Sequence, residues 1–206
     1  MAQKSDENED LRVRRTRKLL QEALIELTVE KGFGAITVRD ITEQAMVNRS
    51  TFYRHYLDKY ELLNQYFDEL SALVSETTLL AEKSSQTSPE KVPAGLLVLV
   101  KHVQEYADFY RVMLGQNGDQ IFTYRFRQMS EKRYRNLFSR FGDTPDPKAP
   151  PIEMKLNYLS CAAVGAILWW LENDQPSTPE QLAIWLGQLS MTTAGLTLPQ
   201  PEPISH

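Results

Sequence analysis

Residues 32–63 read GFGAITVRDITEQAMVNRSTFYRHYLDKYELL and contain the signals from which the fold follows. Thr37, followed three residues later by Asp40, has the form of a capping box, which predicts the start of a short helix. Asn48 is a good N-cap for another short helix that ends near Tyr56. Because only about three residues would separate these two helices, their spacing predicts a helix-turn-helix.

A longer helix is predicted on each side of this motif. The helix before it has an apolar face at the spacing i, i+3, i+4, i+7, and Gly32 supplies its left-handed stop. This face consists of Leu20, Ala23, Leu24 and Leu27. The helix after the motif opens with a second capping box, from Asp58 to Glu61. Its apolar stripe consists of Leu62, Leu63, Tyr66, Phe67, Leu70 and Leu73.

Helical periodicity continues through the rest of the chain, without strand-like alternation or an internal repeat. Helices are predicted at residues 94–110, 121–141, 152–172 and 179–196, with a polar linker at 84–93 and a proline-rich loop at 142–151. The expected fold class is all-α: an N-terminal three-helix helix-turn-helix domain, joined by a long helix to a C-terminal helical ligand-binding and dimerisation domain. The expected boundaries are a disordered acidic tail at 1–10, the DNA-binding domain at 11–63, the regulatory domain at 64–198 and a flexible tail at 199–206.

The net charge of −4 is unevenly distributed along the chain. Residues 11–59 hold ten Lys or Arg and six Asp or Glu, whereas residues 1–10 and 60–206 are both acidic. A basic segment in an acidic chain is the asymmetry expected when one part meets phosphate. The cluster at the start of this segment is read either as an arm that seeks phosphate or as a soluble helix start. It consists of Arg12, Arg14, Arg15, Arg17 and Lys18.

The sequence lacks the signatures of several other classes of protein. There is no P-loop, no glycine-rich dinucleotide turn and no nucleophile elbow, so we expect no enzyme and no cofactor. His55, His102 and His206 form no Cys/His cluster, so we expect no metal site. The single cysteine, Cys161, cannot form an intramolecular disulfide, and the longest apolar run, 159–171, is shorter than a membrane span. We therefore expect a cytoplasmic protein that has no membrane segment.

The second short helix has the composition of a DNA recognition helix. Phe52 and Tyr56 are four residues apart and would pack inward, so Ser50, Thr51 and Arg54 would point elsewhere. A recognition helix is held by a small core while its outer face reaches base edges and its flanks touch phosphates. For Arg49 and Arg54, solvated surface charges are the alternative.

The motif and its flanks closely resemble the DNA-binding domain of the TetR/AcrR family of transcription regulators. The resemblance covers about residues 11–63, with many positions in register. It rests on the runs Gly32-Phe33, Ile36-Thr37-Val38-Arg39-Asp40-Ile41, Val47-Asn48-Arg49-Ser50-Thr51-Phe52-Tyr53-Arg54-His55-Tyr56 and Lys59-Tyr60-Glu61-Leu62-Leu63. One departure is Met46, where the family often has glycine. If the turn is left-handed, a side chain there costs about 1 kcal/mol, which the fold tolerates.

The resemblance implies a set of residues on or beside operator DNA. These are Thr37, Arg39, Arg49, Ser50, Thr51, Tyr53, His55 and Lys59, to which we add Asn48 and Arg54 from the same helix. Lys59 matches the lysine at the start of the fourth helix that commonly meets a backbone phosphate. The alternatives are a hydrophobic cap for Tyr53, a solvated charge for Arg49 and a structural role for His55.

The C-terminal region resembles the family more weakly, through the subgroup that includes dihydroxyacetone-kinase regulators. The runs that carry this likeness are 106–115 and 162–173. The resemblance implies a homodimer that forms through a four-helix bundle from the helices at about 152–172 and 179–196. Small residues on the first of these helices would let another helix approach closely, and an internal helix contact is the alternative.

The family also implies a pocket for an unknown small-molecule effector. The candidate ligand-binding residues are Tyr106, Phe109, Tyr110, Met113, Phe122, Phe126, Met129 and Trp169. An aromatic stripe at helical spacing is more often core than pocket, so both interpretations stay open.

The expected protein is a ligand-responsive repressor that binds double-stranded operator DNA of palindromic sequence as a homodimer. Two alternatives remain: a co-regulator of the same fold that acts through a protein partner, and a small-molecule enzyme built on a helical bundle. A co-regulator relieved of DNA binding has no need for DNA-contacting residues in register. Arg49, Thr51, Tyr53 and Lys59 are all present, which favours DNA.

Overall fold

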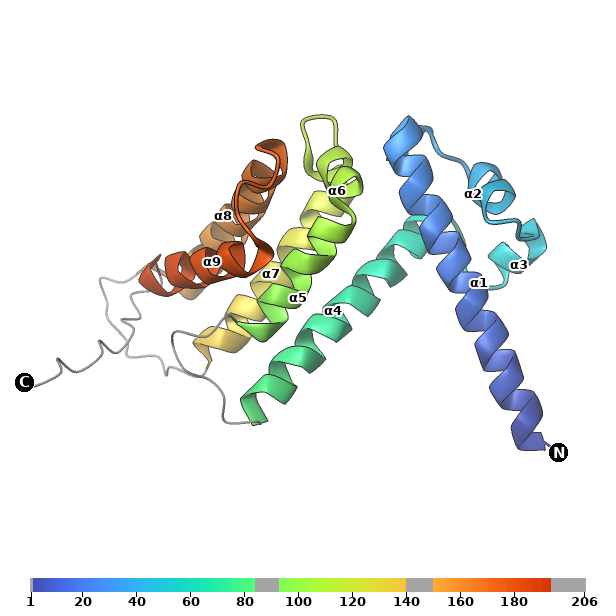
Figure 1. Cartoon of the computed structure of the whole chain (residues 1–206), viewed down its shortest axis with the longest axis horizontal. Helices are drawn as coiled ribbons and strands as arrows, with labels where there is room; N and C mark the ends of the chain where they lie inside the picture. Colours follow the sequence, from blue (N-terminus) through green and yellow to red (C-terminus); the bar gives the residue numbers. More distant parts are fainter. Residues whose placement is uncertain (1, 84–92, 140–149, 194–206) are drawn as a thin grey trace, which may run out of the picture. The chain divides into compact units, whose positions relative to one another are not determined.

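The computed structural model describes residues 2–83, 93–139 and 150–193, and every regular element within these ranges is a helix. Figure 1 shows their arrangement. The elements are α1 (Ala2–Lys31), the 3₁₀-helix η1 (Phe33–Ala35), α2 (Val38–Gln44), α3 (Arg49–Tyr53), α4 (Lys59–Lys83), α5 (Ala94–Glu105), α6 (Ala107–Leu114), α7 (Gln120–Phe138), α8 (Ile152–Glu172) and α9 (Pro179–Thr193). No strand occurs in these three ranges, and the predicted all-α class is confirmed.

Besides α7, which ends at Phe138 instead of at residue 141, the helix bounds differ from the sequence-based expectation in three places. α3 ends at Tyr53 instead of near Tyr56, because the chain tightens there: the His55 N–H donates to the Phe52 carbonyl, three residues back. The predicted helix 94–110 is divided into α5 and α6 at Tyr106, whose φ of −112° and ψ of 38° are not helical. Residues 2–10, expected to be disordered, belong to α1.

The chain divides into two compact units, and each is described by itself. The first comprises Met1–Leu70 with Tyr106–Thr123, and the second comprises Ser71–Glu105 with Tyr124–His206. The expected boundary after residue 63 takes no account of α6, which belongs to the first unit. The predicted linker (84–92 of it), the proline-rich loop at 142–149 and the tail at 199–206 lie outside the described residues.

The first unit is built around α1, which packs against η1, α2 and α6. Gly32 follows the last residue of α1 and has a left-handed φ of 77°. Its N–H donates a hydrogen bond to the Thr28 carbonyl, and the next residue, Phe33, is buried. The apolar side chains buried around α1 include Leu20, Leu24, Leu27, Phe33, Ile36, Ile41, Phe52, Tyr56, Leu62 and Leu63. The predicted inward faces of α1, α3 and α4 are therefore confirmed, except that Leu73 of α4 is 51% exposed and its neighbour Val74 is buried instead. The small core around α1 carries the helix-turn-helix.

The second unit has α9 packed against both α5 and α8. Its buried polar contacts include the Tyr134 hydroxyl, 2.8 Å from the Ser190 hydroxyl. Gly95 of α5 lies so close to α4 that an added Cβ would be 2.7 Å from the Val74 carbonyl oxygen, so the contact requires glycine. Helix α8 is long and apolar enough to cross a membrane by length and composition alone. Eight of its residues are nevertheless buried inside this unit, as expected of a helix in the core of a folded domain.

Candidate nucleic-acid interface

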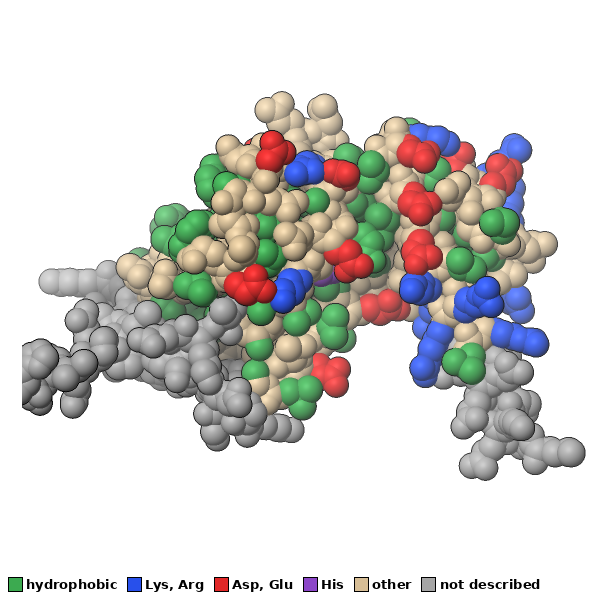
Figure 2. Space-filling view, viewed as in Figure 1, with side chains coloured by type: hydrophobic (Ala, Val, Ile, Leu, Met, Phe, Trp, Pro, Cys, Tyr) green, Lys and Arg blue, Asp and Glu red, His purple; other side chains and the backbone are tan. Residues whose placement is uncertain are grey.

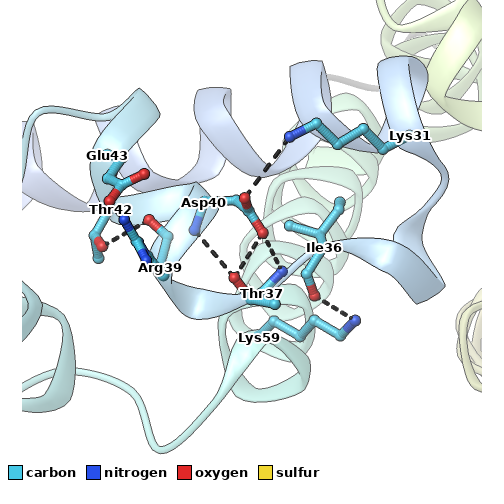
Figure 3. A network of polar contacts seen from close by, with 8 residues as sticks. All are labelled: Lys31, Ile36, Thr37, Arg39, Asp40, Thr42, Glu43 and Lys59. Carbon is cyan, nitrogen blue, oxygen red and sulfur yellow. Dashed lines mark hydrogen bonds and ion pairs between the residues drawn. The ribbon is translucent and has the colours of Figure 1, made fainter.

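The N-terminus of α2 is fixed by a complete capping box. The Thr37 hydroxyl donates a hydrogen bond to Asp40 Oδ2 at 2.6 Å and accepts one from the Asp40 N–H. The Thr37 N–H donates to the same carboxylate oxygen at 2.8 Å. These bonds hold the pKa of Asp40 below its usual value. Lys31 adds an ion pair at 3.7 Å (Figure 3). The Thr37 side chain is exposed, and its hydroxyl serves the cap.

The turn between α2 and α3 is a Schellman motif with methionine in the left-handed position. Val47 N–H donates to the Thr42 carbonyl at 2.9 Å, and Met46 N–H donates to the Glu43 carbonyl at 3.2 Å. Met46 has φ 51°, and its side chain is 94% exposed. The methionine therefore bears the cost of a left-handed backbone without burying its side chain.

We expect Met46→Gly to stabilise the protein by about 0.5–1 kcal/mol, because glycine adopts positive φ without a steric cost. Chemical denaturation of the DNA-free protein measures the change. Met46→Ala is the matched control, since it removes the same exposed side chain but keeps the Cβ. A gain in Met46→Ala equal to that in Met46→Gly would assign the effect to the side chain and contradict the backbone argument.

Helix α3 has one inward side chain and an outer face of polar groups. Asn48 caps it, with Oδ1 accepting from the Ser50 N–H at 2.9 Å. Phe52 is fully buried and packs its ring against Tyr56. The exposed side chains of the segment are Asn48, Arg49, Ser50, Tyr53 and Arg54, and Thr51 is half-buried. The sequence-predicted division between inward and outward residues holds.

Two further predicted DNA contacts, Arg39 and His55, are influenced by neighbouring residues of the first unit. Arg39 is exposed and forms an ion pair with Glu43 at 2.7 Å, one turn along α2. His55 is half-buried, and desolvation lowers its pKa, with the charges of Arg17 and Arg54 acting in the same direction. The imidazole is therefore predominantly neutral at neutral pH.

Lys59, the first residue of α4, donates to three backbone carbonyls of the segment between α1 and α2. Its Nζ lies 2.7 Å from the Phe33 oxygen, 3.2 Å from the Gly34 oxygen and 2.8 Å from the Ile36 oxygen. Figure 3 shows this ammonium beneath the N-terminus of α2. Burial lowers the pKa of Lys59, while the carboxylates of Asp119 and Asp58 act in the opposite direction.

The basic cluster at residues 12–18 lies on α1, so it is part of a helix. Figure 2 shows Lys and Arg side chains gathered over the part of α1 next to its grey N-terminal residues, and acidic side chains farther along the helix. The sequence did not single out Arg17 from this cluster. Its charge acts on His55 and Tyr56, which follow α3, and its Nε is buried without a hydrogen-bond partner. No spacing rule links residue 17 to residue 55.

Most of the predicted ligand-binding residues lie inside aromatic packing. In the first unit Phe109, Tyr110 and Phe122 are buried and contact one another edge to face, at 5.4–5.8 Å between ring centroids. Met113 and Phe126 are also fully buried, Met129 is half-buried and Trp169 is half-exposed on α8. Tyr106 lines a cleft of about 410 Å³ in the first unit. Its other lining residues are Arg14, Arg17, Lys18, Gln21, Glu22, Ile25, Tyr66 and Glu69.

Two family models match the chain and place this helix-turn-helix among known proteins. Residues 20–66 match the model described as bacterial regulatory proteins, tetR family. Residues 90–191 match the TetR model described as transcriptional regulator C-terminal region. The chain belongs to the TetR family. The matched families and curated relatives are transcriptional regulators and not enzymes, in line with the sequence-based expectation.

Curated relatives of this TetR-family chain come from Bacillus subtilis (strain 168). The uncharacterized HTH-type transcriptional regulator YxbF is 26% identical over 175 residues, which are 84% of this chain and 44% of YxbF. The uncharacterized regulator YuxN is 27% identical over 120 residues, which are 56% of this chain and 39% of YuxN. The matches thus span less than half the length of these two relatives.

Solved structures share the fold along 88–92% of the chain. A TetR transcriptional regulator from Streptococcus agalactiae 2603V has a TM-score of 0.62 at 24% identity, covering 90% of this chain and 98% of that one. The dihydroxyacetone kinase operon activator DhaS has a TM-score of 0.60 at 19% identity, covering 88% and 97%. FadR of Thermus thermophilus, solved with lauroyl-CoA, has a TM-score of 0.53 at 19% identity, covering 92% and 99%. At these identities the likeness extends to the fold alone.

Proposed function

We propose that this TetR-family regulator binds a specific operator through the outer face of α3, as a homodimer. The observation that carries the proposal is the exposed polar face formed by Arg49, Ser50, Tyr53 and Arg54 on a helix anchored by buried Phe52. Arginine, serine and tyrosine supply the donors that reach base edges and phosphates. Arg39 at the start of α2 is the proposed flanking contact, once its exposed pair with Glu43 opens.

We expect Arg49→Ala and Tyr53→Ala each to weaken operator binding by about 1–3 kcal/mol, roughly ten- to hundredfold. Arg49 is exposed and Tyr53 is 51% exposed, so neither change removes a core side chain. The operator is first obtained by selecting genomic DNA fragments with the purified wild-type protein at physiological salt. Affinities for the enriched sequence are then measured for each variant.

The matched control is Lys132→Ala, which removes an exposed cation from α7 in the second unit. It should bind the operator as the wild type does, and circular dichroism should be the same for all the variants. Unchanged affinity in both α3 variants would remove this face from the DNA site. A folded wild type that enriches no sequence would support the alternative, a co-regulator that acts through a protein partner.

The proposed dimer uses the outer faces of α8 and α9, where large apolar side chains are exposed in the single chain. On α8, Met154, Tyr158 and Trp169 share one helical face with the exposed small residues Ala162 and Gly165. On α9, Trp185 and Leu189 are exposed one turn apart. Exposed apolar side chains in this number favour an interface, because burying each contributes about 1.5–3 kcal/mol. Cys161 is also exposed on α8.

A two-fold dimer predicts a palindromic operator, since each helix-turn-helix would meet an equivalent half-site. Half-site centres one helical turn apart, ~34–36 Å, are the simplest case. Footprinting of the selected operator measures this spacing. Action in the cytoplasm follows from the location of the DNA.

We also propose that a small molecule releases the operator, as expected of a ligand-responsive repressor. The support is the family's C-terminal match, together with FadR of Thermus thermophilus, which was solved with lauroyl-CoA. A ligand that favours one conformer over another would change operator affinity by a coupling free energy of about 1–3 kcal/mol. The eight aromatic and methionine candidates named from the sequence stay a prediction.

A further inference from the structure

The ammonium group of Lys59 has no hydrogen-bond donor left for DNA. A lysine ammonium carries three N–H groups and no acceptor. Three carbonyl oxygens, of Phe33, Gly34 and Ile36, lie within 2.7–3.2 Å of Nζ. One N–H for each carbonyl uses all three. A phosphate contact by this side chain would therefore break at least one of these bonds.

The surroundings of Lys59 fit a compact cation. The Phe33 ring centroid lies 4.7 Å from Nζ, and the Tyr60 ring centroid lies 5.6 Å away, so two aromatic faces share in the contact. The Phe33 and Tyr60 rings also pack edge to face at 5.2 Å. A planar guanidinium with its donors in a rigid fork cannot direct three N–H groups at oxygens that converge on one point.

The carbonyls that Lys59 binds belong to the segment that leads into α2. Ile36 is followed directly by Thr37, whose side chain caps α2. Within this segment the backbone provides two long bonds, 3.2 Å from the Ala35 N–H to the Gly32 oxygen and 3.4 Å from the Ile36 N–H to the Phe33 oxygen. Lys59 thus joins the start of α4 to the residues that set where α2 begins, and α2 carries the turn into α3.

We propose that Lys59 is a positioning residue: its ammonium fastens residues 33–36 to α4 and so holds the helix-turn-helix in place, instead of binding a DNA phosphate. The effect of Lys59 on operator affinity rests on the proposed DNA-binding function. Its effect on the DNA-free protein does not.

The decisive variants are Lys59→Arg and Lys59→Met. Arginine keeps the positive charge and could still reach a phosphate, but it cannot replace the three carbonyl bonds. We expect both variants to lower the midpoint of thermal unfolding of the DNA-free protein by several degrees and to weaken operator binding to a similar extent. Lys31→Met is the matched control, because it removes an ammonium with a single, exposed ion pair to Asp40, and its midpoint should stay near that of the wild type.

Salt dependence separates the two roles of Lys59. Loss of a phosphate contact lowers the slope of log affinity against log salt concentration by about one, whereas loss of a positioning contact leaves the slope unchanged. We expect the slope of Lys59→Met to equal that of the wild type, although its affinity is lower. Wild-type affinity in Lys59→Arg, together with a reduced slope in Lys59→Met, would overturn the proposal.

A spectroscopic measurement on the wild type keeps the proposal testable if both variants fail to fold. In a protein with ¹⁵N-labelled lysine, the Lys59 ammonium should give a slowly exchanging signal before any DNA is added. The exposed Lys132 should exchange with water too fast to be seen. A Lys59 signal as fast as that of Lys132 would overturn the proposal, whether or not the protein binds an operator.

Discussion

Replacing Phe52 with alanine is expected to unfold the helix-turn-helix locally and to abolish operator binding. The Phe52 side chain is fully buried, with 0% of its surface exposed to solvent, and it is the only buried residue of α3. A helix of five residues has no stability of its own, so α3 exists only while this ring is packed. Removing a buried phenylalanine costs about 3–5 kcal/mol, which is a large share of the stability of a small unit.

Hydrogen exchange of the α3 amides and chemical denaturation measure this loss. Phe52→Leu is the matched control, since it keeps an apolar side chain of similar size and should cost less than about 1.5 kcal/mol. Phe126→Ala removes an equally buried ring from the second unit and should leave α3 protection unchanged. Full protection of α3 in Phe52→Ala would show that another contact holds the helix.

The helix-turn-helix could be predicted because its signals are local. Thr37 and Asp40 are three residues apart, and Asn48 needs only the N–H of Ser50, two residues on. Such caps are readable from the order of residues alone. The resemblance raises a left-handed turn at Met46 only as a condition, and the structure has it, at φ 51°.

The role of Lys59 could not be predicted in this way. Its carbonyl partners lie 23–26 residues earlier in the chain, and nothing in the type of Phe33, Gly34 or Ile36 marks its carbonyl as an acceptor. A lysine at a helix start looks the same whether it faces phosphate or its own backbone. The break at Tyr106 is equally hidden, because residues 94–110 keep an apolar periodicity on both sides of it.

The aromatic candidates for ligand binding show a different limit. Helical spacing identified Phe109, Tyr110 and Phe122 as inward residues, and all three are buried. Burial alone does not separate a pocket wall from a core, since both present the same spacing. Their ring contacts favour the core interpretation, and Tyr106 alone among the candidates lines the cleft beside α1.

Replacing Leu189 with glutamate is expected to leave the protein monomeric and to weaken operator binding by roughly 10²–10⁴-fold, because two linked half-site contacts become independent. Leu189 is 63% exposed in the single chain, so its removal does not open the core of the second unit. A carboxylate placed in the proposed α8–α9 interface would have to be buried without a partner on each side of the two-fold axis. Sedimentation measures the mass of the variant, and titration with the selected operator measures its affinity.

Leu80→Glu on α4 is the matched control, since Leu80 is 60% exposed and lies outside α8 and α9. It makes the same chemical change at a similar exposure, and we expect it to remain dimeric with wild-type affinity. If Leu189→Glu stays dimeric while Leu80→Glu dissociates, the interface involves α4 instead. If both variants stay dimeric and bind the operator normally, the exposed apolar residues of α8 and α9 serve another contact. Crosslinking from Cys161 would then identify the partner of this face, because Cys161 is exposed on the same helix as Met154 and Trp169.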